Sequence, residues 1–150
     1  MAKKKGRKGQ KRKPPPRCKA ILFCQTTIME AGTNNISIIR MFDRFMQSQF
    51  PSQTFPFIVF LQLVSGIGHY QAAIEIHDLQ NGSVLARAEG SIDFADRVLA
   101  QNLMIPVPPF ILPHAGAYDV VILADAQEIE RNQFTAVSIE ELQHGDNQGT

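Results

Sequence analysis

The chain has 150 residues, 44% of them hydrophobic and 19% charged, which is typical of one soluble globular domain. Its longest apolar run, residues 55–64, is interrupted by Pro56 and Gln62 and is far shorter than the roughly 20 residues of a membrane-spanning helix, which excludes a transmembrane helix. The basic start is not followed by an apolar segment of about 7 to 15 residues, as a secretory signal would require. The two cysteines form no CxxC pair, so we expect a cytoplasmic protein with reduced thiols.

Charge is divided sharply between the start of the chain and the rest. The net charge of +1 conceals ten basic residues among the first nineteen positions, which contain no acidic residue: Lys3, Lys4, Lys5, Arg7, Lys8, Lys11, Arg12, Lys13, Arg17 and Lys19. The rest of the chain has five arginines, no lysine and all fourteen acidic residues, a formal charge of −9. Dense like charge beside the three prolines 14–16 cannot bury enough apolar surface to offset the ordering entropy. The pattern therefore predicts a disordered basic tail over residues 1–19.

From residue 20 the sequence is typical of short strands. Alternating apolar residues and β-branched or aromatic enrichment predict strands at residues 20–29, 36–42, 57–64, 69–77, 84–89, 99–107, 117–124 and 129–137. Residues 30–35 supply glycine and asparagine for a tight turn, and Asn81-Gly82 is the strongest hairpin signal. Residues 57–64 are the best core candidate, and the prolines after residue 105 place the strand at 99–107 on a sheet edge.

Residues 43–54 follow the second predicted strand and have a different pattern. Phe42, Phe45, Met46 and Phe50 recur at partly helical spacing, and Pro51 ends any helix after about two turns. We predict a short helix or an irregular link here.

These elements predict an all-β fold. About seven or eight short strands with frequent turns favour a two-layer antiparallel β-sandwich, immunoglobulin-like or similar. The predicted organisation is a basic tail at residues 1–19, a β-sandwich domain at residues 20–137 and a polar C-terminal tail at residues 138–150.

Three structural motifs carry a family resemblance. They are the Glu30-Ala31-Gly32 turn after the opening strand, the Phe-Pro-Phe entry at residues 55–57, and a proline-rich link that reaches Gly116-Ala117-Tyr118 before two final strands. In these features residues 20–137 resemble a family of uncharacterised bacterial single-domain β-sandwich proteins of unknown function. The resemblance implies a fold, with no activity, cofactor or site attached to it.

No sequence motif identifies a reaction, a metal site or a cofactor. The chain has no GxSxG, SxxK or HExxH motif and no acidic calcium loop, so we expect no catalytic residue, no metal and no cofactor. Cys18 falls in the tail, and Cys24 is predicted to be a buried, inert thiol in mid-strand. His69, His114 and His144 are predicted to be isolated and solvated.

The strongest candidate for a polar site is a group of residues on one face of the strand predicted at residues 69–77. Glu75 and His77 share that face and could meet Arg87 across the Asn81-Gly82 hairpin. We interpret this group as an exposed cross-strand charge network. The alternative is a metal or acid-base site formed by the same residues.

The basic tail carries the strongest functional signal, because ten cations attract any polyanion and release its counterions. Our leading hypothesis is a non-catalytic binding or scaffold module, with the sandwich bound to a protein partner and the tail to nucleic acid or another acidic surface. A tail that only aids solubility is the plain alternative. Two other functions remain open: a small-molecule or enzymatic site near Glu75, His77 and Arg87, and homo-oligomerisation through an exposed edge strand, for which Phe110 and Ile111 are candidates if they are not covered.

Overall fold

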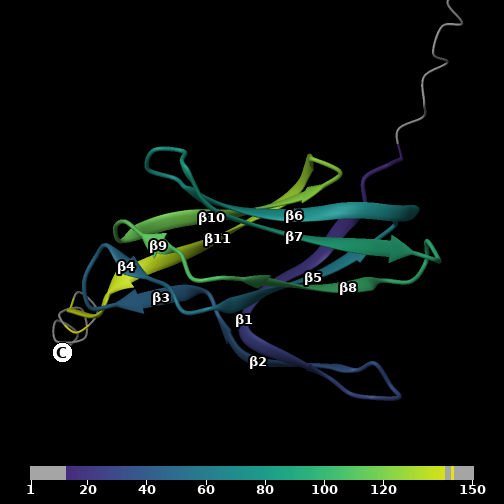
Figure 1. Cartoon of the computed structure of the whole chain (residues 1–150), viewed down its shortest axis with the longest axis horizontal. Coiled ribbons are helices and arrows are strands. Elements are labelled where there is room, and N and C mark those ends of the chain that lie inside the picture. Colours follow the sequence, from purple (N-terminus) through teal and green to yellow (C-terminus); the bar gives the residue numbers. More distant parts are fainter. Residues whose placement is uncertain (1–12, 141–142, 144–150) are drawn as a thin grey trace, which may run out of the picture.

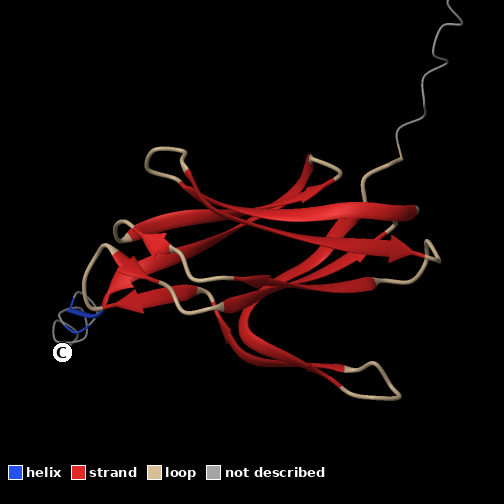
Figure 2. Cartoon of the chain, in the orientation of Figure 1, coloured by secondary structure: helices blue, strands red, loops and turns tan. Residues whose placement is uncertain are grey.

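A computed structural model describes residues 13–140 and residue 143 of the chain. Two sheets stack face to face, as Figure 1 shows, and strands make up most of the described chain (Figure 2). The four-stranded sheet contains, in spatial order, β2 (Ile36–Phe42), β1 (Arg17–Met29), β5 (Phe57–Val64) and β8 (Gln101–Val107). The five-stranded sheet contains β3 (Arg44–Gln47), β11 (Gln127–Ser138), β10 (Gly116–Ala124), β6 (Gly68–Asp78) and β7 (Val84–Phe94). A small separate pair joins β4 (Ser52–Gln53) to β9 (Ile111–Leu112).

The predicted all-β sandwich is confirmed, with two corrections to its strands. The structure has eleven strands, more than the seven or eight expected, because short pieces such as β4 and β9 carry no sequence signal of their own. The sandwich is also not wholly antiparallel, since β3 pairs with β11 in parallel over Arg44 to Gln47. Within the described residues, no helix has the length and apolar character that crossing a membrane requires.

The short helix predicted within residues 43–54 is wrong. Arg44–Gln47 forms strand β3, and Phe45 of that strand is buried in a cluster of aromatic rings. Its ring centroid lies 4.9 Å from that of Phe42, 5.4 Å from that of Phe57 and 5.3 Å from that of Phe134. Packing of this ring between the two sheets outweighs the weak helical spacing of the sequence.

The core lies between the sheets and is built from alternate residues of the long strands. In β5, Phe57, Val59, Leu61 and Leu63 are buried, which confirms this segment as a main part of the core. The facing β6 residues are buried at the alternate positions Tyr70 to Ile76, as predicted. Phe110 is also buried in this core, so it is covered and offers no edge for assembly, whereas Ile111 in β9 is exposed.

The hairpins and the sheet edge agree with the sequence, although several strand ends differ. The turn around Asn81-Gly82 joins β6 to β7, with Gly82 at a φ of 75° that favours glycine. β8 lies at the edge of the four-stranded sheet, as its prolines predicted. β7 runs to Phe94, five residues beyond its predicted end, because its last residues still pair with the start of β6.

The predicted boundary between tail and domain is too late in the chain. Arg17, Cys18 and Lys19 belong to β1, and Cys18 packs against the core, so Cys18 does not lie in a tail. Arg17 is the first residue of β1, and it pairs with Val64, the last residue of β5. Pairing along β5 therefore extends the fold into the basic segment, and residues 1–12 of the tail predicted for residues 1–19 lie outside the described residues. β11 ends at Ser138, and most of the predicted C-terminal tail also lies outside them.

The outward face of the four-stranded sheet has an apolar centre and no acidic residue. Phe23 and Val59, paired across β1 and β5, point into the core, so the next pair in each direction points outward: Leu22 with Phe60 and Cys24 with Ile58. The strands of this sheet contain no acidic residue and three basic ones: Arg17, Lys19 and Arg40. The strands of the five-stranded sheet contain seven acidic residues: Glu75, Asp78, Glu89, Asp93, Asp119, Glu128 and Glu130.

Candidate functional site

The three residues predicted to form a polar group do meet on the outward face of β6 and β7. Nε2 of His77 lies 3.0 Å from Oε1 of Glu75, and an Arg87 NH group donates to the other oxygen of Glu75. Nε of Arg87 also donates to Glu89 over 3.3 Å. The antiparallel register that places Glu75 opposite Arg87 is set by the Asn81-Gly82 hairpin, which is why the contact was predictable from sequence.

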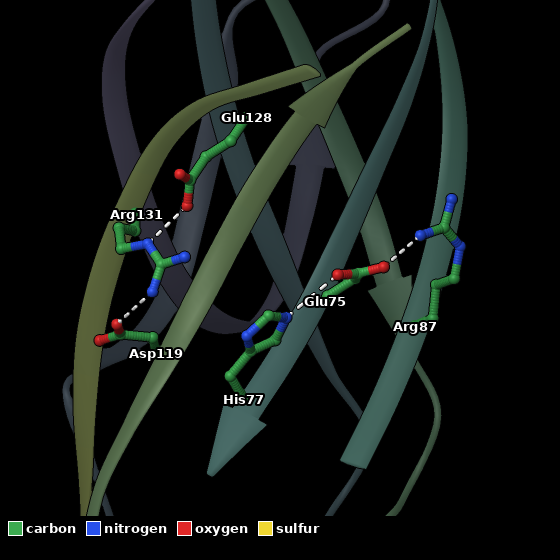
Figure 3. Close-up of polar contacts among 6 residues, drawn as sticks. All are labelled: Glu75, His77, Arg87, Asp119, Glu128 and Arg131. Atoms are coloured by element: carbon green, nitrogen blue, oxygen red, sulfur yellow. Dashed lines mark hydrogen bonds and ion pairs between the residues drawn. The ribbon is translucent and has the colours of Figure 1, made fainter. Parts of the chain in front are cut away.

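A second ion-pair group continues this row onto the next two strands (Figure 3). Arg131 of β11 donates to Asp119 of β10 over 3.0 Å and to Glu128 over 2.5 Å. Asp119 is the register partner of His77, so the two groups lie on adjacent strands of the same sheet face. This second group was not predicted, although the pairing of β10 with β11 gives the same kind of signal.

This row has the geometry of a cross-strand ion-pair network. The hydrogen bond from His77, followed by that from Arg87, holds the pKa of Glu75 below its ordinary value, so Glu75 is a carboxylate at neutral pH. A carboxylate whose pKa is lowered and which already accepts hydrogen bonds from two side chains is a poor general acid. In the described part of the chain, no three His, Cys, Asp or Glu side chains are grouped so that they could hold a metal ion.

The end of the basic segment is anchored on the sandwich. Nζ of Lys13 lies 4.0 Å from the ring centroid of Tyr70 and 3.5 Å from a carboxylate oxygen of Asp125. The Tyr70 hydroxyl donates to the carbonyl oxygen of Pro14 over 2.7 Å and accepts from the backbone NH of Ile67 over 2.9 Å. Tyr70 itself is fully buried, so this contact ties the segment to the core.

The ten predicted polyanion-binding cations are only partly placed by the structure. Three are described: Lys13 at the anchor, and Arg17 and Lys19 as exposed residues of β1. The other seven lie outside the described residues: Lys3, Lys4, Lys5, Arg7, Lys8, Lys11 and Arg12. The structure therefore fixes the point from which these charges extend.

A partly exposed histidine pairs with a fully buried aspartate, and the sequence did not predict this pair. His114 and His69 were predicted to be isolated, but Nε2 of His114 lies 2.8 Å from Oδ2 of Asp78, and His69 lies 2.9 Å from Asp93. The His114 ring also stacks on Tyr118, with ring centroids 5.4 Å apart. The alternation that buries Ile76 also turns the side chain of Asp78 inward. Because a buried carboxylate requires a polar partner, the sequence already indicated that Asp78 would have one.

Both ring nitrogens of His114 face oxygen acceptors. Nδ1 lies 2.8 Å from the carbonyl oxygen of Ala115, on the opposite side of the ring from Asp78. The bond to Ala115, followed by the bond to Asp78, raises the pKa of His114, because the protonated ring can donate to both oxygens. The neighbouring hydroxyl of Tyr118 donates to the backbone carbonyl of His114 over 2.6 Å, so these contacts account for a structural role.

The two cysteines are free, and their surroundings make them unreactive. Cys24 is 0% exposed, as predicted, and burial raises the pKa of its thiol. Burial also raises the pKa of Cys18 to about 11, assisted by the nearby charge of Glu130. Neither thiol is poised to ionise at neutral pH.

The fold and its polar surface define a single-domain all-β protein of the sandwich class. The model of a family described as "Family of unknown function (DUF6941)" matches residues 19–137, and the chain belongs to this family. This confirms the expected membership in an uncharacterised single-domain family, and the match has nearly the predicted boundaries. No curated protein matches the chain.

Proposed function

We propose that this protein is a non-catalytic binding or scaffold module. Its basic N-terminal segment contacts a polyanion, either nucleic acid or another acidic surface, while the sandwich binds a protein partner. The observation that carries the proposal is the separation of charge: ten cations precede residue 20, and all fourteen acidic residues follow it. Such a cluster of cations binds polyanions by releasing condensed counterions.

The anchored end of the segment supports this arrangement. Lys13 and Pro14 are held at Tyr70, and the chain then enters β1, in a sheet whose strands carry no acidic side chain. Arg17 and Lys19 have no ion-pair partner among the described residues, so their charge is available to a bound anion. We place the protein in the cytoplasm of a bacterium as part of this proposal, and the two free thiols support a reducing compartment.

The test is the salt dependence of binding to a short DNA duplex, measured by fluorescence anisotropy. The full chain is compared with a variant in which the seven cations before Lys13 are changed to glutamine. The variant keeps Lys13, Pro14 and the whole of β1, because removing residues 1–19 would also remove the Tyr70 anchor.

We expect log affinity to fall linearly with log salt, with a slope of about 0.9 for each phosphate neutralised. The variant should lose most of this slope. Equal affinity and equal slope for the two proteins would exclude the segment as the polyanion-binding element. The same comparison with heparin shows whether the anion must be a nucleic acid.

A further inference from the structure

A hollow opens between the edge strands of the two sheets. β2 is the terminal strand of the four-stranded sheet, and β3 is the terminal strand of the five-stranded sheet. The hollow has a volume of about 500 Å³. Its lining includes Arg40, Met41, Arg44, Met46 and Phe55, and we call it the Arg40–Arg44 hollow.

Large apolar side chains are exposed at this hollow. Met41 is 65% exposed, Met46 57% and Phe55 44%. The ring of Phe55 packs on Phe42, with centroids 5.3 Å apart, so the lining is continuous with the aromatic cluster of the core. Methionines adapt to differently shaped apolar groups, and exposed apolar patches of this kind often bind partners.

The two arginines of the hollow are weakly neutralised, unlike those of the charge row. Arg131 pairs with two carboxylates, whereas Arg44 contacts only its chain neighbour Asp43, over 3.8 Å between two exposed side chains. Arg40 has no ion-pair partner among the described residues. These two cations therefore offer charge-assisted hydrogen bonds to an incoming carboxylate.

The backbone around Arg40 is also unusual. Its φ of 54° lies in the left-handed region, which costs a non-glycine residue free energy unless its surroundings require it. β2 pairs with β1 alone, so the other edge of its backbone is open to another strand. Exposed edges are usually protected by lysine, proline or inward charges, and β2 has no lysine, proline or acidic residue.

We infer that the free edge of β2, with the Arg40–Arg44 hollow beside it, binds an extended acidic segment of a partner protein. The backbone of the segment pairs with β2, its carboxylates meet Arg40 and Arg44, and one large apolar side chain enters the hollow. This inference rests on the proposed function, because it names the surface by which the sandwich holds its protein partner.

Charge favours an acidic peptide over a second copy of this chain. A second β2 would bring another Arg40 to the same interface and no carboxylate, so the like charges would repel. A highly charged polyanion is also a poor occupant, because methionine and phenylalanine side chains line much of the hollow.

The experiment uses a labelled eight-residue peptide. One glutamate stands on each side of a phenylalanine near its centre, and valines alternate with these three residues. Binding to the full chain is measured by fluorescence anisotropy, and a matched peptide carries lysine in place of each glutamate. A third peptide is methylated on alternate backbone nitrogens, which blocks strand pairing. We expect the acidic peptide to bind and both altered peptides to bind at least about tenfold more weakly.

Protein variants locate the site. Arg40→Gln and Arg44→Gln should each weaken binding of the acidic peptide by about tenfold. Arg97→Gln is the matched control, because it makes the same change in net charge in the loop between β7 and β8, and it should leave the affinity unchanged. Urea unfolding of each variant confirms that it folds.

Three results would overturn the inference: equal binding of the acidic and lysine peptides, equal loss with Arg97→Gln, or no peptide binding at all. Concentration-dependent dimerisation that Met41→Lys abolishes, measured by sedimentation, would instead assign the edge to a second copy. DNA binding by Arg40→Gln should stay at the level of the unchanged chain. Loss of peptide binding and loss of DNA binding are therefore separate outcomes, and either proposal can fail alone.

Discussion

The two outward faces of the sandwich have opposite chemistry on the same kind of scaffold. On the five-stranded sheet, paired charges run from Arg87 on β7 to Arg131 on β11 (Figure 3). On the four-stranded sheet, the outward positions Leu22, Cys24, Ile58 and Phe60 are apolar, and its strands carry no acidic residue. The charge of −9 that follows residue 19 is therefore not spread evenly. One sheet face is covered by paired charges, whereas the strands of the other contain only the three basic residues Arg17, Lys19 and Arg40.

The largest effect should come from placing a charge on the apolar face. Cys24→Asp puts a carboxylate at a fully buried, outward position between Leu22 and Ile58. We expect the free energy of unfolding in urea to fall by about 3 kcal/mol or more, because no partner is present to satisfy the charge.

Ser91→Asp is the matched control on the other face, at an exposed position of β7. Its free energy of unfolding should change by no more than about 0.5 kcal/mol. Equal costs for the two substitutions would mean that the faces do not differ in their contact with water.

The second prediction concerns Asp78. Its side chain is fully buried, whereas the other described ion pairs of the five-stranded sheet are partly exposed. His114→Ala should lower stability by about 2 kcal/mol, because Asp78 loses its cationic partner and keeps the backbone NH of Gln80. His69→Ala, which removes an exposed pair with Asp93, should cost about 0.5 kcal/mol or less.

The pH dependence of His114 has a defined sign. Its pKa is raised in the folded protein, so its contribution is complete below the ordinary value of about 6.5 and is lost as the pH rises through the raised value. His114→Gln should remove this part of the pH dependence in urea unfolding curves. A wild-type curve that gains stability over this pH range would contradict the assignment.

The third prediction tests the hydrogen bonds by which Tyr70 of β6 holds the segment before β1. Tyr70→Phe removes the hydrogen bonds to Pro14 and Ile67, and we expect a loss of about 1.5 kcal/mol. Trypsin should also cleave after Arg17 more rapidly in this variant. Lys13→Gln removes the exposed contacts of the cation with the Tyr70 ring and with Asp125 and should cost about 0.5 kcal/mol, which separates the hydroxyl from the cation.

The smallest effect belongs to the charge row. A double-mutant cycle with Glu75→Gln and Arg87→Gln should give a coupling of about 0.5 kcal/mol, since Arg87 is largely exposed. The lowered pKa of Glu75 means that this contribution is present above its ordinary pKa and is lost as the pH falls through the lower value. A loss of partner or ligand binding in either variant, without a loss of stability, would favour the alternative site.

Contacts within one hairpin were predictable from sequence. The register of Glu75 against Arg87 follows from the Asn81-Gly82 turn, and the alternation in residues 57–64 identifies the core face. These features depend on residues close in the chain, for which turn geometry and side-chain alternation suffice.

Contacts between distant residues were not predictable in this way. β3 pairs with a strand about ninety residues later, and its four residues leave no periodic pattern. The Tyr70 bond to Pro14 spans 56 residues, and that between His114 and Asp78 spans 36. Their partners depend on how the sheets stack, which local propensity does not encode.

The position of the Tyr70 anchor has a mechanical consequence. The anchored segment before β1 lies above the sandwich in Figure 1, and β2 lies below the sandwich in the same view. An anion bound near the anchored segment and a peptide paired with β2 would therefore not compete for space. With both the anion and the peptide bound, the domain would link the two. Binding of one ligand would raise the effective concentration of the domain near the other, so two weak contacts would give a higher overall affinity.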